Sequence, residues 1–330
     1  MTGGLEGDAG VMRSRTLAAV RLLVAAAVAL ALVWGVARNW TEISQDLQRV
    51  SLGAVLLSFA PAALGTWLTM LGWRVVLADL GSPLHMAPAG GVFFVGQLGK
   101  YLPGSVWTVL VQADMAAHLH VPRRRTGVAG LVTIGLSVLT GILVGLPALP
   151  LLLRQSSGAP GWLLLAVPLL AVLAWPALLN RMIALGLRVL RRPPLEHSLS
   201  ARAILTTVVL YAVAWLLFGV HILVLALAVG AGGSATLAAL TGYALAGSLG
   251  MLTVVLPAGL GARDAILTLV LASAIPVSAA TAVAIVSRFV VTIVDVLAAA
   301  GGWAYARRHH LVTSRAEREH QAAETVVDEP

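Results

Sequence analysis

Long apolar runs alternate with short polar or charged stretches along most of this chain. Each run reaches about 20 residues or more, the length that a helix needs to cross the roughly 30 Å hydrocarbon core of a bilayer. A polar stretch at residues 38–49 follows the first run and predicts a loop. The pattern predicts six membrane-spanning helices, at residues 16–36, 52–77, 126–153, 161–185, 203–229 and 277–305.

Two further apolar segments, residues 88–115 and 236–274, are interrupted by proline, glycine and charge. The interruptions read GQLGKYLPGSVW and VVLPAGLGARDAIL. Each predicts two short helices, with Pro103 in the first turn of one helix and another beginning near Gly261. A break at membrane depth frees backbone groups that lipid cannot satisfy, so it persists only where protein or water covers it. Paired breaks in two halves of a chain point to a transporter's binding site.

The composition also indicates a polytopic helical membrane protein. Hydrophobic residues make up 59% of the chain and charged residues only 11%. Continuously apolar runs disfavour a porin-type barrel, whose strands alternate apolar and polar residues. The absence of cysteine excludes disulfides and thiolate chemistry. The net charge of +8 comes from arginines at the ends of apolar segments, which indicates orientation in a membrane and no nucleic-acid partner.

Arginine clusters predict the topology, because positively charged loops stay in the cytoplasm. They occur before the first run, at residues 123–125, between residues 188 and 202, and at residues 307–308. If both broken segments are hairpins, every cluster falls on the cytoplasmic side. Each half is then span, span, hairpin, span, in opposite orientation, which is an inverted-topology repeat. The predicted units are a tail at 1–15, a membrane domain at 16–306 with halves 16–153 and 161–306, and a disordered tail at 307–330.

Few ionisable residues lie inside the apolar segments. A charge at the bilayer centre costs about 2.5–3.5 kcal/mol, so each one needs a partner or water. Purely structural roles are open to them: an ion pair of Arg288 with Asp295 along one helix face, Lys100 snorkelling to the interface, and a helix cap by Arg263 and Asp264. Asp114 is as compatible with an interfacial as with a buried position. His221, mid-span, is expected to be a packed or hydrogen-bonded residue, because no second metal ligand is spaced for it.

The functional interpretation of these residues is an anion site built from both broken segments. Helix N-termini with free N–H groups favour a phosphate, and basic side chains add charge. Glycines let the backbone approach the ligand closely. An apolar lateral opening would hold acyl or prenyl chains. The candidate substrate-binding residues are Lys100, Tyr101, Pro103, Gly104, Trp107, Pro257, Gly259, Gly261, Arg263, Asp264, Arg288 and Asp295.

The two interrupted stretches carry a family resemblance. GQLGKYLPGSVW and LPAGLGARDAIL resemble the two signature stretches of the lysylphosphatidylglycerol synthase transmembrane region, also called the flippase-like family. Asp264 stands where that family usually has Glu. The resemblance implies a multi-pass protein of the inner (plasma) membrane. It also implies a stand-alone form, because only about 25 residues follow the last span and an aminoacyltransferase domain would need far more.

We expect a lipid flippase for an anionic phospholipid or a polyprenyl-phosphate-linked headgroup. The alternative is a non-transporting scaffold for a glycosyltransferase or aminoacyltransferase partner. An enzyme is the least expected reading, since no Walker loop, HExxH, nucleophile elbow or Rossmann motif occurs, and no cofactor or metal is predicted. A groove open sideways to lipid would favour the flippase. A tightly packed interior with a flat apolar face would favour the scaffold.

The topology predicts that both chain termini face the cytoplasm, since all four arginine clusters agree on that side. Reporter fusions to each end, one active only in the cytoplasm and one active only outside, measure this directly. An external C-terminus would contradict the predicted topology and the inverted repeat with it.

Overall fold

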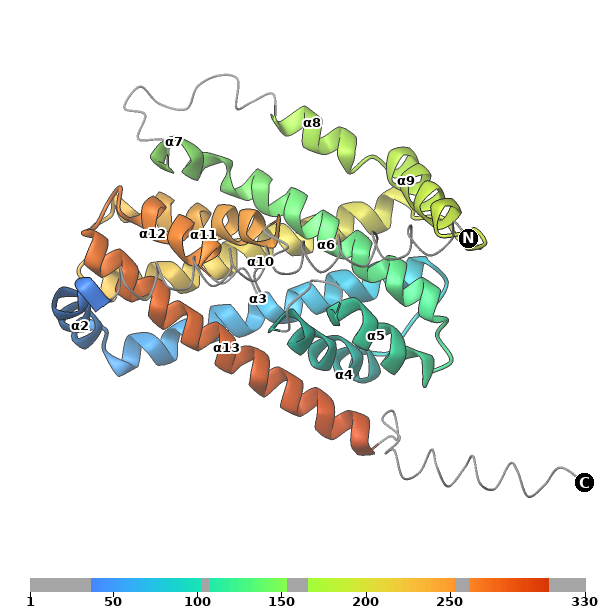
Figure 1. Cartoon of the computed structure of the whole chain (residues 1–330), viewed down its shortest axis with the longest axis horizontal. Helices are drawn as coiled ribbons and strands as arrows, with labels where there is room; N and C mark the ends of the chain where they lie inside the picture. Colours follow the sequence, from blue (N-terminus) through green and yellow to red (C-terminus); the bar gives the residue numbers. More distant parts are fainter. Residues whose placement is uncertain (1–36, 102–106, 153–165, 253–260, 309–330) are drawn as a thin grey trace, which may run out of the picture.

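The computed structural model describes residues 37–101, 107–152, 166–252 and 261–308 of the chain. Every regular element within these ranges is a helix (Figure 1). The predicted first span and the C-terminal tail from residue 309 lie outside the described residues. So do Pro103, Gly104, Pro257 and Gly259.

The first half holds two long helices on either side of a broken hairpin. The structure confirms two predicted helices of this half, at residues 52–77 and 126–153. It also confirms that the first broken segment is divided into two helices. The elements are α2 (Trp40–Arg49), α3 (Leu52–Asp79), α4 (Met86–Gln97), the 3₁₀ turn η1 (Leu98–Tyr101), α5 (Trp107–Ala117) and α6 (Arg123–Gly145), which continues through η2 (Leu146–Ala148) into α7 (Leu149–Leu152).

The second half repeats this order. Within the described ranges, five helices are long and apolar enough to cross a membrane: α3, α6 with its extension to Leu152, α10, α11 and α13. The chain is therefore a polytopic helical membrane protein, as the sequence predicts. The remaining elements are α8 (Ala166–Leu173), α9 (Pro176–Val189), α10 (Ala201–Ala228), α11 (Ala235–Leu252), α12 (Ala262–Leu271) and α13 (Val277–Arg308).

The two halves begin their described spans in the same way. Ser51 caps α3 by accepting a hydrogen bond from the Ala54 amide, and Ser200 caps α10 by accepting one from the Ala203 amide, both at 3.2 Å. A serine in this position satisfies an amide that the first helical turn leaves without a partner. Both helices then run for 28 residues.

Helices α3 and α10 lie side by side and run in opposite directions. Asp79, at the end of α3, accepts hydrogen bonds from the amide and hydroxyl of Ser200, at the start of α10. At the other end, the Ser58 carbonyl contacts the ring of His221. Because these helices occupy equivalent places in the two halves, their antiparallel arrangement is the one that an inverted repeat requires.

The remaining helix contacts occur in matched pairs. Helix α4 packs against α13 as α11 packs against α6, and the arms of each hairpin contact each other. Gly96 faces Gln112 inside the first hairpin, and Gly250 faces Arg263 inside the second. These two glycines are separated along the chain by the same interval as Pro103 and Pro257.

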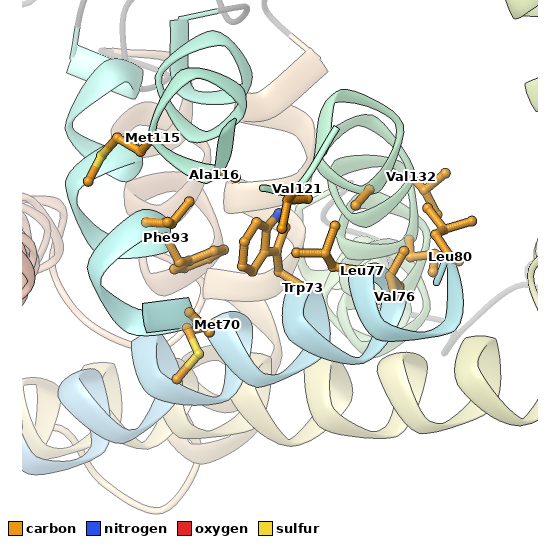
Figure 2. Close-up of a cluster of buried hydrophobic side chains, with 14 of the residues drawn as sticks. Met70, Trp73, Val76, Leu77, Leu80, Phe93, Met115, Ala116, Val121 and Val132 are labelled. Atoms are coloured by element: carbon orange, nitrogen blue, oxygen red, sulfur yellow. The ribbon is translucent and has the colours of Figure 1, made fainter. Parts of the chain in front are cut away.

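The apolar interior has two main clusters, one toward each end of the bundle. The first joins the C-terminal half of α3 to the first hairpin and the start of α6, with Trp73 at its centre (Figure 2). The second joins the C-terminal half of α10 to α11, α12 and the start of α13. The hairpins therefore enter the bundle from opposite ends.

The described arginine clusters gather at one end. Arg124 donates to the Pro193 carbonyl, while Arg125 donates to the Gly81 carbonyl and pairs with Glu196. Arg307 and Arg308 end α13 (Figure 1). This grouping is what the positive-inside rule requires of a single membrane face.

Two predicted elements are wrong. Residues 40–49 form the helix α2 and not a loop. Ile43 and Asp46 lie on one face that the bundle buries, while the other positions, mostly polar, are partly or fully exposed. The predicted span at 161–185 is divided in its described part into α8 and α9. Pro176 disfavours a helical conformation at Trp175 and lacks an amide hydrogen, and α9 begins at this proline, whereas Pro61 lies inside the continuous helix α3.

Glycine sets the distance between α10 and α11. A Cβ atom added to Gly219 would lie 2.3 Å from the Leu240 carbonyl oxygen. Small residues at such a crossing let membrane helices approach closely enough for van der Waals packing to hold them.

We therefore predict that Gly219→Ala lowers the thermal unfolding midpoint in detergent. The extra methyl must push backbone apart, and overpacking of this kind costs about 1–3 kcal/mol. Gly135→Ala is the matched control, because a Cβ at Gly135 meets nothing within 4 Å and Ala is the better helix former. Equal midpoints for the two variants would show that the α10–α11 contact is not tight.

Candidate functional site

A buried carboxylate in the middle of α13 ties the first hairpin to this helix. Asp295 is nearly inaccessible, with 2% of its side chain exposed. Its Oδ2 atom lies 2.7 Å from the Lys100 Nζ and accepts a hydrogen bond of 2.6 Å from the Tyr101 hydroxyl. Both partners belong to η1, so the 3₁₀ turn at the end of α4 presents two consecutive side chains to one acid.

A second carboxylate ties the second hairpin to the same helix. Arg288 of α13 donates from Nη1 to Asp264 Oδ2 at 2.6 Å. Arg263 donates from Nε and Nη2 to the other oxygen, at 3.2 and 3.1 Å. Asp264 therefore lies between two guanidinium groups, and the local net charge is positive.

Tyr243 of α11 completes this second group. Its hydroxyl lies 3.2 Å from Arg263 Nη1, and the guanidinium carbon is 5.4 Å from the centre of its ring. Gly261 makes the arrangement possible, since its φ of 84° lets the chain turn sharply into α12 immediately before Arg263. Helix α12 begins at Ala262, which confirms the predicted start of a helix near Gly261.

The two groups are neighbours. Arg288 and Asp295 are two turns apart on α13, a rise of about 10 Å. Tyr101 and Arg263, one from each hairpin, are close enough to interact electrostatically. The residues that flank the predicted breaks thus meet at α13, whereas Pro103 and Pro257 themselves lie outside the described residues.

The charges of this cluster do not cancel. Lys100, Arg263 and Arg288 carry three positive charges, and Asp264 and Asp295 carry two negative ones. Among the described residues, these five side chains leave one positive charge unbalanced. Such a charge is costly in a low-dielectric setting, and an anionic ligand would compensate it.

The structural roles that the sequence left open for Arg288, Lys100 and Asp264 differ from the contacts that these residues make. Arg288 and Asp295 do not pair with each other, because the hairpins give each a closer partner. Lys100 is one-third exposed, but its ammonium group binds Asp295 and so does not snorkel away. Asp264 lies in the first turn of α12 without capping it, because both of its oxygens are turned to arginines.

Two residues singled out in the sequence, Asp114 and Trp107, are exposed, and one residue of the site, Tyr243, was not predicted. Asp114 is not buried: its side chain is more than half exposed and pairs with Arg123 at 2.7 Å. Trp107 begins α5 and is 46% exposed. Tyr243 was not predicted; its only sequence signal is a tyrosine inside the small-residue pattern Gly242, Ala246, Gly250.

His221 is a buried, hydrogen-bonded residue, as predicted. Its Nδ1 lies 3.0 Å from the Ser58 carbonyl oxygen, and its Nε2 lies 3.0 Å from the Ser287 hydroxyl. A carbonyl only accepts, so Nδ1 carries the proton and Nε2 accepts from the serine. Both ring nitrogens are used to join α3, α10 and α13, which leaves no lone pair for a metal.

An apolar groove of about 580 Å³ lies between α3, α4 and α13. Phe59, Trp67, Phe94 and Leu297 line it, together with small residues of α4 and α13. Trp67 and Leu297 are also substantially exposed, so the groove opens on the outside of the bundle.

The arrangement defines a class of protein: a polytopic helical membrane protein in which two broken hairpins meet at a charged centre. The chain belongs to the family of the lysylphosphatidylglycerol synthase TM region, whose model matches residues 19–299. Membership confirms the resemblance seen in the two interrupted stretches and associates the chain with a lipid-related function in the membrane. No curated protein is a significant match to the chain.

We predict that Asp295→Ala strongly destabilises the protein. Removing one partner of a buried ion pair costs about 3–5 kcal/mol, and the partial exposure of Lys100 moves the loss toward the lower value. Asp114→Ala is the control, because an exposed pair contributes at most about 1 kcal/mol. Thermal unfolding in detergent measures both.

The double variant Lys100→Met with Asp295→Leu is expected to recover much of that stability, because it removes the charge together with its partner. A double variant no more stable than Asp295→Ala alone would show that the carboxylate is held by contacts other than the Lys100 pair.

Proposed function

We propose that this protein translocates an anionic lipid across the membrane and binds the lipid phosphate at the junction of its two hairpins. The observation that carries the proposal is the uncompensated positive charge among Lys100, Arg263, Arg288, Asp264 and Asp295. A phosphodiester brings one negative charge and neutralises this cluster. We infer an inner-membrane protein with both termini in the cytoplasm, and a transport function without enzymatic chemistry or cofactor.

The donors suit a phosphate. A guanidinium carries five N–H donors, and the Asp264 contact uses one from Arg288. Lys100 adds an ammonium group with three donors, which its single 2.7 Å contact with Asp295 does not exhaust. When phosphate binds to Lys100 and Arg288, it competes with Asp295 and Asp264 for them. Phosphate binding would therefore loosen the contacts that hold each hairpin against α13.

The two halves differ at matching places, which supports alternating access. The groove between α3, α4 and α13 corresponds by repeat to the space between α10, α11 and α6. Trp215 fills that space: its indole donates to the Ser137 carbonyl at 3.0 Å, and its ring lies against Gly141 and Gly247. The groove of the first half is open, whereas the corresponding space of the second half is packed. An inverted-repeat transporter is expected to show this asymmetry in each of its states.

The scaffold alternative receives less support. It requires a packed interior and a flat apolar face, whereas this structure has a lateral groove and a charged centre. The substrate class that fits both features is a lipid with an anionic headgroup, either a phospholipid or a polyprenyl phosphate.

We predict that Arg288→Lys slows lipid translocation in proteoliposomes by roughly tenfold or more. A lysine keeps the charge but cannot offer the planar fork of donors, and losing a charge-assisted hydrogen bond costs about 1.5–3 kcal/mol. Lys100→Ala is expected to have a similar effect. The assay follows fluorescent phosphatidylglycerol and a fluorescent polyprenyl-phosphate sugar in separate vesicles.

Arg123→Ala is the control, because this exposed arginine pairs only with the surface carboxylate Asp114 in the described structure. It should translocate lipid like the unmodified protein. Vesicles with the unmodified protein that move neither lipid faster than empty vesicles would contradict the proposal and favour the scaffold.

A further inference from the structure

One end of the groove between α3, α4 and α13 lies next to the charged cluster along α13, because the lining residue Val294 directly precedes Asp295. Asp295, Ala298 and Gly302 follow one another at intervals of three and four residues, so they lie on one face of α13. Ala298 and Gly302 line the groove, and Asp295, which follows the lining residue Val294, binds Lys100. From Val294 to Tyr305 the groove follows α13 for roughly 16 Å.

The lining of the groove is smooth and apolar. Gly90 and Gly91 of α4 face Gly302 of α13, so small residues form its floor. Thr66, the one threonine among its lining residues, donates its hydroxyl to the Ala62 carbonyl of its own helix at 3.0 Å. Apart from the polar atoms of Trp67 and Tyr305, the side chains of the lining present hydrocarbon to whatever occupies the groove.

We propose that this groove holds one hydrocarbon chain of the lipid whose phosphate lies at the charged cluster, an inference that rests on the function proposed above. A lipid phosphate can reach the middle of the membrane domain only if its chain follows through apolar surroundings. The groove provides this path, from the cluster toward the end of α13 that carries Arg307 and Arg308. Acyl and isoprenyl chains share the required chemistry.

The groove is expected to guide the chain more than to attract it. Lipid tails are as apolar as the protein surface, so moving a chain from bilayer to groove brings no hydrophobic gain. A side chain that fills the groove should thus obstruct lipids with long chains and leave phosphate binding unchanged. Comparing long-chain lipids with a phosphate that has no chain therefore distinguishes the role of the groove from that of the charged cluster.

Gly301→Leu is the variant that fills the groove with least disturbance. Gly301 lines it, and a Cβ added there meets nothing within 4 Å. Gly135→Leu on α6 is the matched control, also an exposed helical glycine with open space around it. Ala63→Leu fills the groove from α3 and provides a second, independent variant.

The experiment uses proteoliposomes with two probes in parallel, a diacyl phosphatidylglycerol and a polyprenyl phosphate, each with a diazirine in its chain. We expect labelling of α4 and α13 beside the groove, and a decrease of about tenfold in Gly301→Leu and Ala63→Leu but not in Gly135→Leu. Labelling by only one of the two probes supports the proposal that the groove holds a lipid chain. The probe that labels then shows whether this chain is acyl or isoprenyl.

Glycerophosphoglycerol, a headgroup without chains, separates the two proposals. Its binding should be the same in the unmodified protein and in Gly301→Leu, and weaker in Arg288→Lys. If it binds in this way but labelling is insensitive to the groove variants, the groove inference is wrong and the proposed function stands. If neither chain probe labels the protein specifically and the headgroup does not bind, both are wrong.

Discussion

Charged groups inside a membrane must be paired, and in this protein a single helix supplies one member of both pairs. Helix α13 offers Asp295 to the first hairpin and Arg288 to the second. The cost of an unpaired charge in the bilayer is what fixes each hairpin against this helix. Helix α13 supplies the negative charge in one pair, Asp295 with Lys100, and the positive charge in the other, Arg288 with Asp264. The helix can therefore hold two elements that enter the bundle from opposite ends.

This arrangement links stability and function. Five charges that neutralised one another would make a purely structural cluster, but three cations and two carboxylates leave one positive charge. The bundle retains this charge near an apolar groove that opens on the outside of the described helices. The ion pairs Lys100–Asp295 and Arg288–Asp264 hold the hairpins against α13. A ligand that competes for Lys100 and Arg288 would therefore couple its own binding to movement of the hairpins.

Much of the fold could be predicted from the sequence, since apolar length and charged ends determine spans and orientation. The runs at residues 52–77, 126–153 and 203–229 correspond closely to helices in the structure. The break at Pro176 was missed, and proline alone does not identify it, because Pro61 lies inside the continuous helix α3. Helix α2 was missed because ten mostly polar residues give too short a pattern to distinguish a helix from a loop.

The members of the charged cluster could be predicted, but their partners could not. Arg288 and Asp295 share a helix face, and local spacing alone favours pairing them with each other. Their actual partners, Asp264 and Lys100, come from distant segments that only the folded chain brings together. Tyr243 was missed for the same reason, because an aromatic residue in an apolar helix resembles any packing residue until its neighbour is known.

The central claim is that a lipid phosphate lies at this cluster, and Lys100 allows a direct measurement. It is the only lysine in the chain, so labelling with ¹⁵N-lysine gives a single ammonium signal. Solid-state NMR of the protein in anionic lipid then measures the dipolar coupling between this nitrogen and lipid ³¹P. The account predicts a coupling that corresponds to hydrogen-bond contact, and its loss in bilayers without anionic lipid. An ammonium signal coupled only to the Asp295 carboxylate in every lipid would contradict it.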